Sequence, residues 1–244
     1  AVGIVLVWGY GGILSLGQGA FFGLGSYMMA MFLKLESAAD AGSSSGTALA
    51  AFFGTAGLPD FMAWNSVEEL PWWWEPFHHI WFTIPAIILI PAFVAFVLGY
   101  ANFRRRVSGV YFAIVTLAVS AILAIVIIGQ QGLTGGINGI TDFKTFLGMD
   151  LDTDGAKLIM YYITAVLLIV ILLAARFVLK SRLGRVLVAI RDSDDRVRYT
   201  GYDPAMFQAF IFSVAALFSA IGGAMFTIQI GLASPALVGI VPSI

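Results

Sequence analysis

Residues 80–106 read IWFTIPAIILIPAFVAFVLGYANFRRR, an apolar run that ends abruptly in three arginines. From position 80 to position 103 there is no Asp, Glu, Lys, Arg or His. A helix needs about 20 apolar residues to cross the hydrocarbon core of a bilayer. Because water cannot hydrate backbone polar groups there, a helix that satisfies them internally is expected. The stretch therefore predicts a transmembrane helix followed by a basic connection.

Further segments of the same kind indicate a polytopic membrane protein. Of the 244 residues, 60 % are hydrophobic and 11 % are charged, against about 45–50 % and about 25 % in soluble domains. Clear spans are expected at about 108–129, 158–179 and 206–230, a glycine-rich span at about 16–35, and the remaining end of another at 1–10. The alternating pattern of a membrane β-barrel is absent. We therefore expect an all-α polytopic integral membrane protein with about six transmembrane helices, the first of them partial.

The domain organisation follows from these spans. We expect residues 1–244 to form a single transmembrane domain. The sequence starts without Met inside one apolar run and stops soon after another, so we expect a piece of a longer protein that is truncated at both ends.

The charges of the connections predict the orientation. Ten of the 13 Lys and Arg residues lie at 104–106 and 176–198, and basic connections remain in the cytoplasm. The connections at about 34–78 and 131–156 are acidic and are expected outside. The connection at about 180–205 is then a cytoplasmic loop, and the topology alternates without conflict.

The sequence lacks the residues that several classes of function require. The net charge of −1 gives no reason to expect nucleic-acid binding, and there is no cysteine. Neither a phosphate-binding GxxxxGK[ST] loop nor an HExxH zinc motif occurs. His78 and His79 are adjacent, without a third ligand nearby, and are interpreted as interfacial polar residues before metal ligands. We therefore expect no catalytic residue, no metal site and no cofactor bound by this chain.

The stretch GYGGILSLGQGAFFGLGSY at residues 9–27 is too rich in glycine for an undisturbed helix. It carries no charge that would mark an ordinary loop. Broken backbone at membrane depth is tolerated where it is buried in protein or lines a cavity. A broken helix that lines a solute path is one interpretation, with Ser15, Gln18, Phe21 and Phe22 as candidate lining. Close packing of helices is the other.

A second glycine-rich stretch, GQQGLTGGINGITDF at residues 129–143, follows a predicted span. Tight turns in an external loop are the simpler interpretation. The alternative is a vestibule at the outer mouth of a solute path, to which Asn138 would contribute.

Six charged residues fall within the eight positions 191–198. The pattern of residues 183–201 predicts a short amphipathic helix with Asp192–Arg196 and Asp194–Arg198 as neighbours one turn apart. Asp203 and Pro204 predict the start of the next span. A helix of mixed charge on the cytoplasmic side is better suited to docking in a polar protein groove than to resting on anionic lipid.

Three stretches together resemble the LivM-type permeases of ATP-binding cassette importers: SLGQGAFFGLGSY (15–27), GGINGITDF (135–143) and SRLGRVLVAIRDSDDRVRYTGYD (181–203). LPDFMAWNSVEELPWWW (58–74) and GGINGITDFK (135–144) resemble, more narrowly, the urea-importer branch of UrtC type. The resemblance implies that the charged segment is a cytoplasmic coupling helix seated in an ATPase subunit. Residues that would face the ATPase or shape the helix are Gly184, Arg185, Ala189, Ile190, Arg191, Asp192 and Gly201.

The resemblance also implies partners and a location. A homologous second permease subunit, two ATP-binding cassette ATPase subunits, an extracytoplasmic solute-binding protein and membrane lipid are expected, in a bacterial inner membrane. ATP would be used by the partner subunits. Urea, which is small, neutral and polar, suits uncharged spans and is the preferred cargo.

Three alternatives stay open at this point. Branched-chain amino acids are the competing cargo. A passive channel for urea would also explain uncharged spans but leaves the mixed-charge helix without a role. An intramembrane enzyme lacks a recognisable pair of nucleophile and base.

Overall fold

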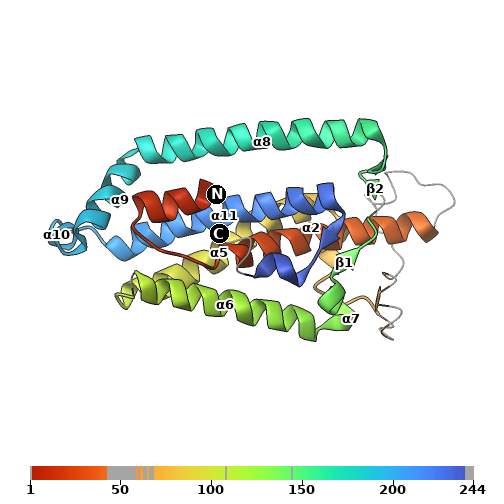
Figure 1. Cartoon of the computed structure of the whole chain (residues 1–244), viewed down its shortest axis with the longest axis horizontal. Helices are drawn as coiled ribbons and strands as arrows, with labels where there is room; N and C mark the ends of the chain where they lie inside the picture. The colour runs from red at the N-terminus through yellow and green to blue at the C-terminus, as the bar shows by residue number, and fades with distance from the viewer. Residues whose placement is uncertain are drawn as a thin grey trace.

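The computed structural model describes residues 2–42, 59, 61, 62, 65, 69–107, 109–143 and 145–239, and its regular structure is almost entirely helical (Figure 1). Four of the described helices are long and apolar enough to cross a membrane: α5 (Ile80–Arg104), α6 (Val110–Gly129), α8 (Asp154–Lys180) and α11 (Pro204–Ile230). Their bounds lie within four residues of the predicted spans. The prediction of an all-α polytopic membrane protein is confirmed.

The ends of α11 follow from local sequence. Asp203 Oδ1 accepts a hydrogen bond from the Ala205 backbone N–H at 3.1 Å, and Pro204 occupies the first turn. At the other end Gly231 adopts a φ of 72°, a left-handed conformation that glycine reaches without a steric penalty. The predicted Asp-Pro start of this helix is confirmed.

The chain begins with a short helix made of α1 (Val2–Ile4) and the wider π-helical turns of η1 (Val5–Tyr10). Residues 11–17 are not helical, and α2 (Gln18–Gly42) follows them. The glycine-rich stretch therefore breaks the helix, as predicted. Since α2 continues well past position 35, the predicted span at 16–35 is too short.

Two charges that the sequence pattern places in an external loop belong to α2 and are buried. Lys34 is 5 % exposed and its Nζ donates to the Thr141 carbonyl oxygen at 3.3 Å. Glu36 is 4 % exposed and its Oε1 accepts from the Gly148 backbone N–H at 2.9 Å. The helix therefore continues past residue 34, where the external loop was predicted to start, and groups of the 141–148 connection bond to its two buried charges. The rest of that loop lies largely outside the described residues.

The core forms where α11 packs against α2 and α5. A Cβ atom on Gly223 would collide with the Phe22 carbonyl oxygen, and one on Gly25 with the Ala220 carbonyl oxygen. The two helices therefore touch backbone to backbone, as small residues allow in membrane proteins. The Ser26 and Thr227 hydroxyls share a buried hydrogen bond of 2.6 Å across this contact.

One end of the molecule holds the short elements, and we call it the acidic end after its carboxylates. They are η2 (Glu75–His78), α7 (Gln131–Thr134), η3 (Gly136–Asn138), β1 (Ile140–Thr141), β2 (Thr145–Phe146), β3 (Met149–Asp150) and β4 (Leu232–Ala233). The short η4 (Pro235–Val238) lies further in, against α2 and α6, where the Val238 carbonyl oxygen accepts from the Ser120 hydroxyl. Strand β1 pairs antiparallel with β4, and β2 with β3. These two-residue strands are a small departure from an all-α fold. The predicted 131–156 connection is present but ends earlier, since α8 begins at Asp154.

The charged connection forms two helices, where one helix over 183–201 was predicted. They are α9 (Arg182–Asp192) and α10 (Asp194–Tyr199). Ser193 between them is extended, with φ −163° and ψ 95°, which ends the first helix. Asp194 and Asp195 then occupy the first turn of α10, where carboxylates are favoured by the helix dipole.

The break at Ser193 decides which predicted ion pairs form. Arg198 Nη2 lies 3.0 Å from Asp194 Oδ2, so that predicted pair is confirmed. Asp192 and Arg196 lie on different helices, and the Asp192 carboxylate instead meets Arg191, with Nη2 and Oδ1 3.2 Å apart. The predicted Asp192–Arg196 pair is therefore wrong.

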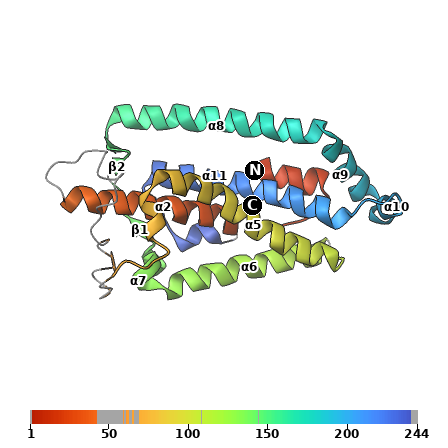
Figure 2. The same cartoon turned by 180° about the vertical axis from the view of Figure 1, so that it is seen from behind.

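Both basic connections lie at the same end of the molecule, which we call the basic end. Figure 1 shows α9, α10 and the turn between α5 and α6 at its left, opposite α7 and β1. Figure 2 shows the same arrangement from behind. The shared end agrees with the predicted alternation of the spans.

Candidate functional site

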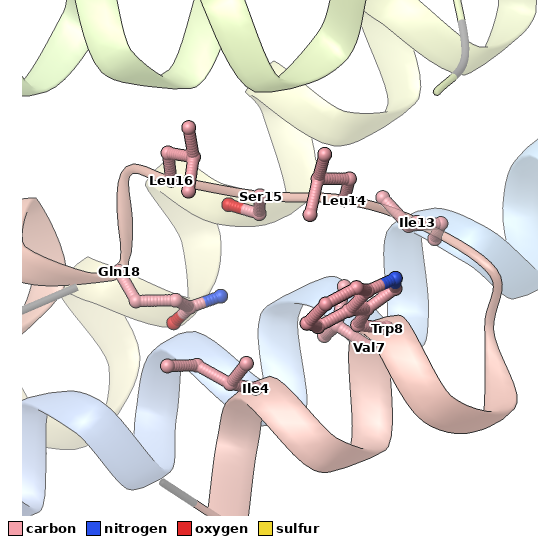
Figure 3. A pocket seen from close by; sticks show the side chains of 8 residues that line it. All are labelled: Ile4, Val7, Trp8, Ile13, Leu14, Ser15, Leu16 and Gln18. Carbon is pink, nitrogen blue, oxygen red and sulfur yellow. The ribbon is translucent and has the colours of Figure 1, made fainter. Parts of the chain in front are cut away.

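The break between η1 and α2 doubles the chain back on itself. Gly12, with a φ of 65°, turns the chain after η1. The Ile13 backbone N–H then donates to the Val7 carbonyl oxygen at 3.0 Å, so the returning segment lies along the helix it has just left. Figure 3 shows residues 13–16 running above η1 with a space between them.

That space is a cavity of about 120 Å³. Its lining residues come from three places, namely α1 with η1, the returning segment and the first residue of α2: Ile4, Val7, Trp8, Ile13, Leu14, Ser15, Leu16 and Gln18. The cavity is large enough to hold water or another small molecule. Its lining contains no ionisable side chain and has only two polar ones.

Those two polar side chains are Ser15 and Gln18, which are 6 % and 2 % exposed. Gln18 Oε1 accepts a hydrogen bond from the Ser219 hydroxyl at 3.0 Å. Its Nε2 and the Ser15 Oγ are buried without a hydrogen-bond partner. In Figure 3 the Gln18 amide nitrogen points toward the cavity. Buried polar atoms are nearly always hydrogen-bonded. Two buried polar atoms without a partner at one cavity therefore indicate that a small polar molecule can bind there.

The cavity lies near the middle of the membrane-spanning helices. Gln18 pairs with Ser219, and Ser26, eight residues further along α2, pairs with Thr227, eight residues further along α11. The two helices therefore run parallel, and α2 begins beside the middle of α11. Broken helices whose ends meet at mid-membrane form the solute sites of many transporters.

Three other predicted path residues do not line this cavity. Phe21 is buried in the core, with its ring 5.5 Å from that of Phe212 in an edge-to-face contact. Phe22 packs in the same way against Phe226, at 5.6 Å. Asn138 is exposed in η3 at the acidic end. The structure brings Ser15 and Gln18 together and leaves these three elsewhere.

The sequence did not reveal the opposite wall of the cavity. Ile4, Val7 and Trp8 form it, whereas the apolar pattern of residues 1–10 indicates only the remaining end of a span. A chain that turns at the Gly11-Gly12 pair has to run back beside what precedes it. The Gly11-Gly12 pair is therefore the sequence feature from which this wall of the cavity could have been predicted.

The predicted coupling residues separate into two groups. Gly184 and Ile190 are buried against their own chain, and a Cβ on Gly184 would meet the Leu179 carbonyl oxygen at the bend between α8 and α9. These two residues shape the loop. Gly201 lies just after α10 with a φ of 86°, which suits the predicted helix end.

Three exposed members of the set, Arg185, Ala189 and Asp192, border a groove of about 450 Å³ at the basic end. Its lining residues come from both helices and the turn that follows them: Arg185, Val186, Ala189, Asp192, Ser193, Arg196, Val197, Thr200 and Tyr202. Arg185, Ala189 and Asp192 are spaced by one helical turn and share this face of α9. Arg191 lies on another side of α9 and contacts η1.

Among the described residues, no group of three His, Cys, Asp or Glu side chains is arranged so that it could hold a metal ion. His78 is half-buried at the end of η2. Its pKa lies below the usual range because of burial first and the neighbouring His79 second, while Glu75 acts in the opposite direction.

The fold and the cavity define a class of protein: an all-helical, multi-pass membrane protein with a broken helix beside a small neutral cavity. A family model described as "Branched-chain amino acid transport system / permease component" matches residues 1–243. The chain therefore belongs to this permease family.

Curated relatives share this assignment at modest identity. Over 96 % of its length the chain is 24 % identical to the high-affinity branched-chain amino acid transport system permease protein LivM of Salmonella typhimurium strain LT2. It is equally similar to the protein of the same name from Escherichia coli strain K12. The chain spans about half the length of each of these relatives. No solved structure matches it.

Proposed function

We propose that the chain is a permease subunit of an ATP-binding cassette importer in a bacterial inner membrane, and that its solute path passes the cavity at Ser15 and Gln18. The observation that carries the proposal is the pair of buried, unpartnered polar atoms at that cavity. The chain itself is a transport subunit, not an enzyme. ATP is hydrolysed by two partner ATPase subunits, and a second permease subunit completes the path.

The mixed-charge groove at the basic end is the proposed ATPase contact. Arg185, Ala189 and Asp192 lie along it, while the buried Gly184 and Ile190 maintain its shape. A groove that presents both signs of charge suits a protein partner, because electrostatic complementarity sets the register of docking. An extracytoplasmic solute-binding protein would deliver the cargo at the acidic end.

Urea is the proposed cargo. It needs donors and acceptors of hydrogen bonds but no countercharge, and the cavity offers one amide N–H₂ group, one hydroxyl and no ionisable side chain. A zwitterionic amino acid would have to satisfy two charges with these dipoles alone. The small volume also favours a small solute.

Branched-chain amino acids are the second candidate. The family description and both curated relatives carry that cargo in their names. Six of the eight lining residues are apolar, as the side chain of leucine or valine would require. These observations favour the second cargo about as strongly as the neutral lining favours the first.

Uptake into proteoliposomes tests both proposals. The full-length protein is reconstituted with its second permease, ATPases and binding protein, and labelled urea or labelled leucine is supplied with and without internal ATP. Urea accumulated above its external concentration only with ATP supports the proposal. Leucine accumulated instead keeps the mechanism and overturns the cargo, and urea that equilibrates regardless of ATP indicates a channel.

Substitutions test the cavity in the same assay. Q18A and S15A each remove one unpartnered polar atom, and transport is expected to fall by about fivefold, since a lost hydrogen bond to a bound solute costs about 1 kcal/mol. S213A is the matched control, because the Ser213 hydroxyl is buried but bonds only to the Ala209 carbonyl oxygen of its own helix. If all three variants transport alike, the path does not pass Ser15 and Gln18.

A further inference from the structure

Arg191 connects the charged loop to the broken helix. Its Nη1 donates a hydrogen bond to the Gly9 carbonyl oxygen at 2.8 Å, across 182 positions of sequence. On the other side of the guanidinium, Nη2 lies 3.2 Å from Asp192 Oδ1. In Figure 1 the red N-terminal helix ends beside α9, where this contact is made. The side chain therefore joins a residue of the groove to the end of η1.

The contact is favourable for two physical reasons. The Gly9 carbonyl belongs to the last turn of η1, where carbonyl oxygens have no partner within the helix. A guanidinium at that end also complements the negative pole of the helix dipole. Gly12 keeps the space open, because a Cβ on it would lie 2.7 Å from Arg191 Cγ.

The returning segment is fixed at its other end as well. The Leu16 backbone N–H donates to Thr116 Oγ1 of α6 at 3.2 Å. A Cβ on Gly17 would lie 2.5 Å from the Thr116 carbonyl oxygen, so the two backbones are in close contact. Residues 13–15, which line the cavity, are thus held between a contact with α9 and a contact with α6.

We propose that Arg191 is a positioning residue that transmits movement of the ATPase-contacting loop to the wall of the solute cavity. A partner in the groove touches Asp192, whose carboxylate holds the Arg191 guanidinium. Displacement of α9 then moves the Gly9 carbonyl and, through the Gly11-Gly12 turn, residues 13–15. The inference rests on the proposed function, since it requires an ATPase partner at the groove.

Substitution of Arg191 separates coupling from assembly. In the reconstituted transporter, R191Q is expected to leave ATPase binding and ATP hydrolysis near their normal levels while solute moved per ATP falls about tenfold, as for the loss of one charge-assisted hydrogen bond. R191K retains the positive charge but lacks the planar guanidinium group, and it should restore part of the solute transported per ATP. R198Q is the control, because Arg198 also loses an ion pair but to Asp194 within α10.

Gly12 provides an independent test on the other side of the contact. G12A introduces a Cβ against Arg191 Cγ and is expected to lower the amount of solute transported per ATP. Gly109 also has a positive φ, of 61°, and a Cβ added there would have nothing within 4 Å, so G109A strains the backbone without touching Arg191. Equal ratios for G12A and G109A would overturn the role of this contact.

A thiol reporter distinguishes failure of this inference from failure of the proposed function. Residues 1–244 contain no cysteine, so L14C gives this part of the protein one thiol, which lies on the cavity wall. Its labelling rate should change when ATP is added to the assembled transporter, and this change should be lost with R191Q but not with R198Q. A change that survives R191Q overturns the inference alone, whereas no change in any background, including the unsubstituted one, counts against the ATPase partner itself.

Discussion

Helices α8 and α11 both have 27 residues and both are long and apolar enough to cross a membrane, yet their surroundings are opposite. Half of the most apolar stretch of α11 is buried inside the molecule, against 11 % of that of α8. Figures 1 and 2 show α8 along one edge of the molecule and α11 within it. Apolar character alone therefore does not decide which helix forms the core.

Residue size explains the difference. In α11 the fully buried positions are mostly small: Ala209, Ala215, Ala216, Ala220, Gly223 and Ala224 have little or no exposed surface. In α8 only Ala156, Met160 and Ala175 are buried, and large side chains such as Leu173 and Phe177 are exposed. Lipid tails are as apolar as leucine, so helices associate where small residues let their backbones approach.

The contrast extends to the space beside each helix. A groove of about 750 Å³ separates α8 from the N-terminal helix, with Leu6, Leu172 and Arg176 among its lining residues. Between α11 and α2, by contrast, a single added Cβ atom meets backbone. The core is closely packed at α11, and α8 contributes little to it within the part of the chain that the structure describes.

The strongest test of this contrast places a leucine in each helix. G223L drives a side chain into the Phe22 carbonyl and should cost more than about 3 kcal/mol, because the two backbones have to separate. In the first turn of α8, a Cβ on the exposed Gly155 would have nothing within 4 Å, so G155L should leave stability near normal. Thermal unfolding of the full-length protein in detergent measures both. Similar melting temperatures would mean that α2 and α11 do not pack as described.

A smaller effect is expected from shortening one aromatic side chain in each helix. F212A removes a fully buried ring that meets Phe21 and Phe112 edge to face, and F177A removes a ring that is 78 % exposed. Phe→Ala costs about 3–5 kcal/mol in soluble cores, and without the transfer from water we expect about 2 kcal/mol for F212A. F177A should stay within about 0.5 kcal/mol. Comparable losses in unfolding experiments would remove the distinction between core and edge.

Features that depend on neighbouring residues were predicted from the sequence. The long helices follow from apolar length, and the start of α11 follows from Asp203 and Pro204. The break before Gln18 follows from the glycines, and the Asp194–Arg198 pair follows from helical spacing. Each of these is decided within a few positions along the chain.

Features that depend on distant contacts were not predicted. Lys34 and Glu36 are buried because residues of the 141–148 connection bond to them. The Arg191 guanidinium meets the Gly9 carbonyl, and Gln18 meets Ser219, 201 positions away. Ser15 and Gln18 line one cavity, but the wall that η1 contributes to it forms only through tertiary folding.

The smallest effect is expected from the removal of one hydrogen bond in each helix, one in the core and one at the edge of the molecule. T227V removes the hydroxyl that shares a buried 2.6 Å bond with Ser26, and T164V in α8 removes the hydroxyl that accepts from Gln229 Nε2 at 2.7 Å. Hydrogen bonds between membrane helices contribute about 0.6 kcal/mol on average, and a buried hydroxyl left unpaired costs about 1 kcal/mol or more. T227V should therefore destabilise by about 1–2 kcal/mol and T164V by about 0.5 kcal/mol. Val keeps the volume of Thr in both variants, so a larger loss for T164V in detergent unfolding would place α8 in the core.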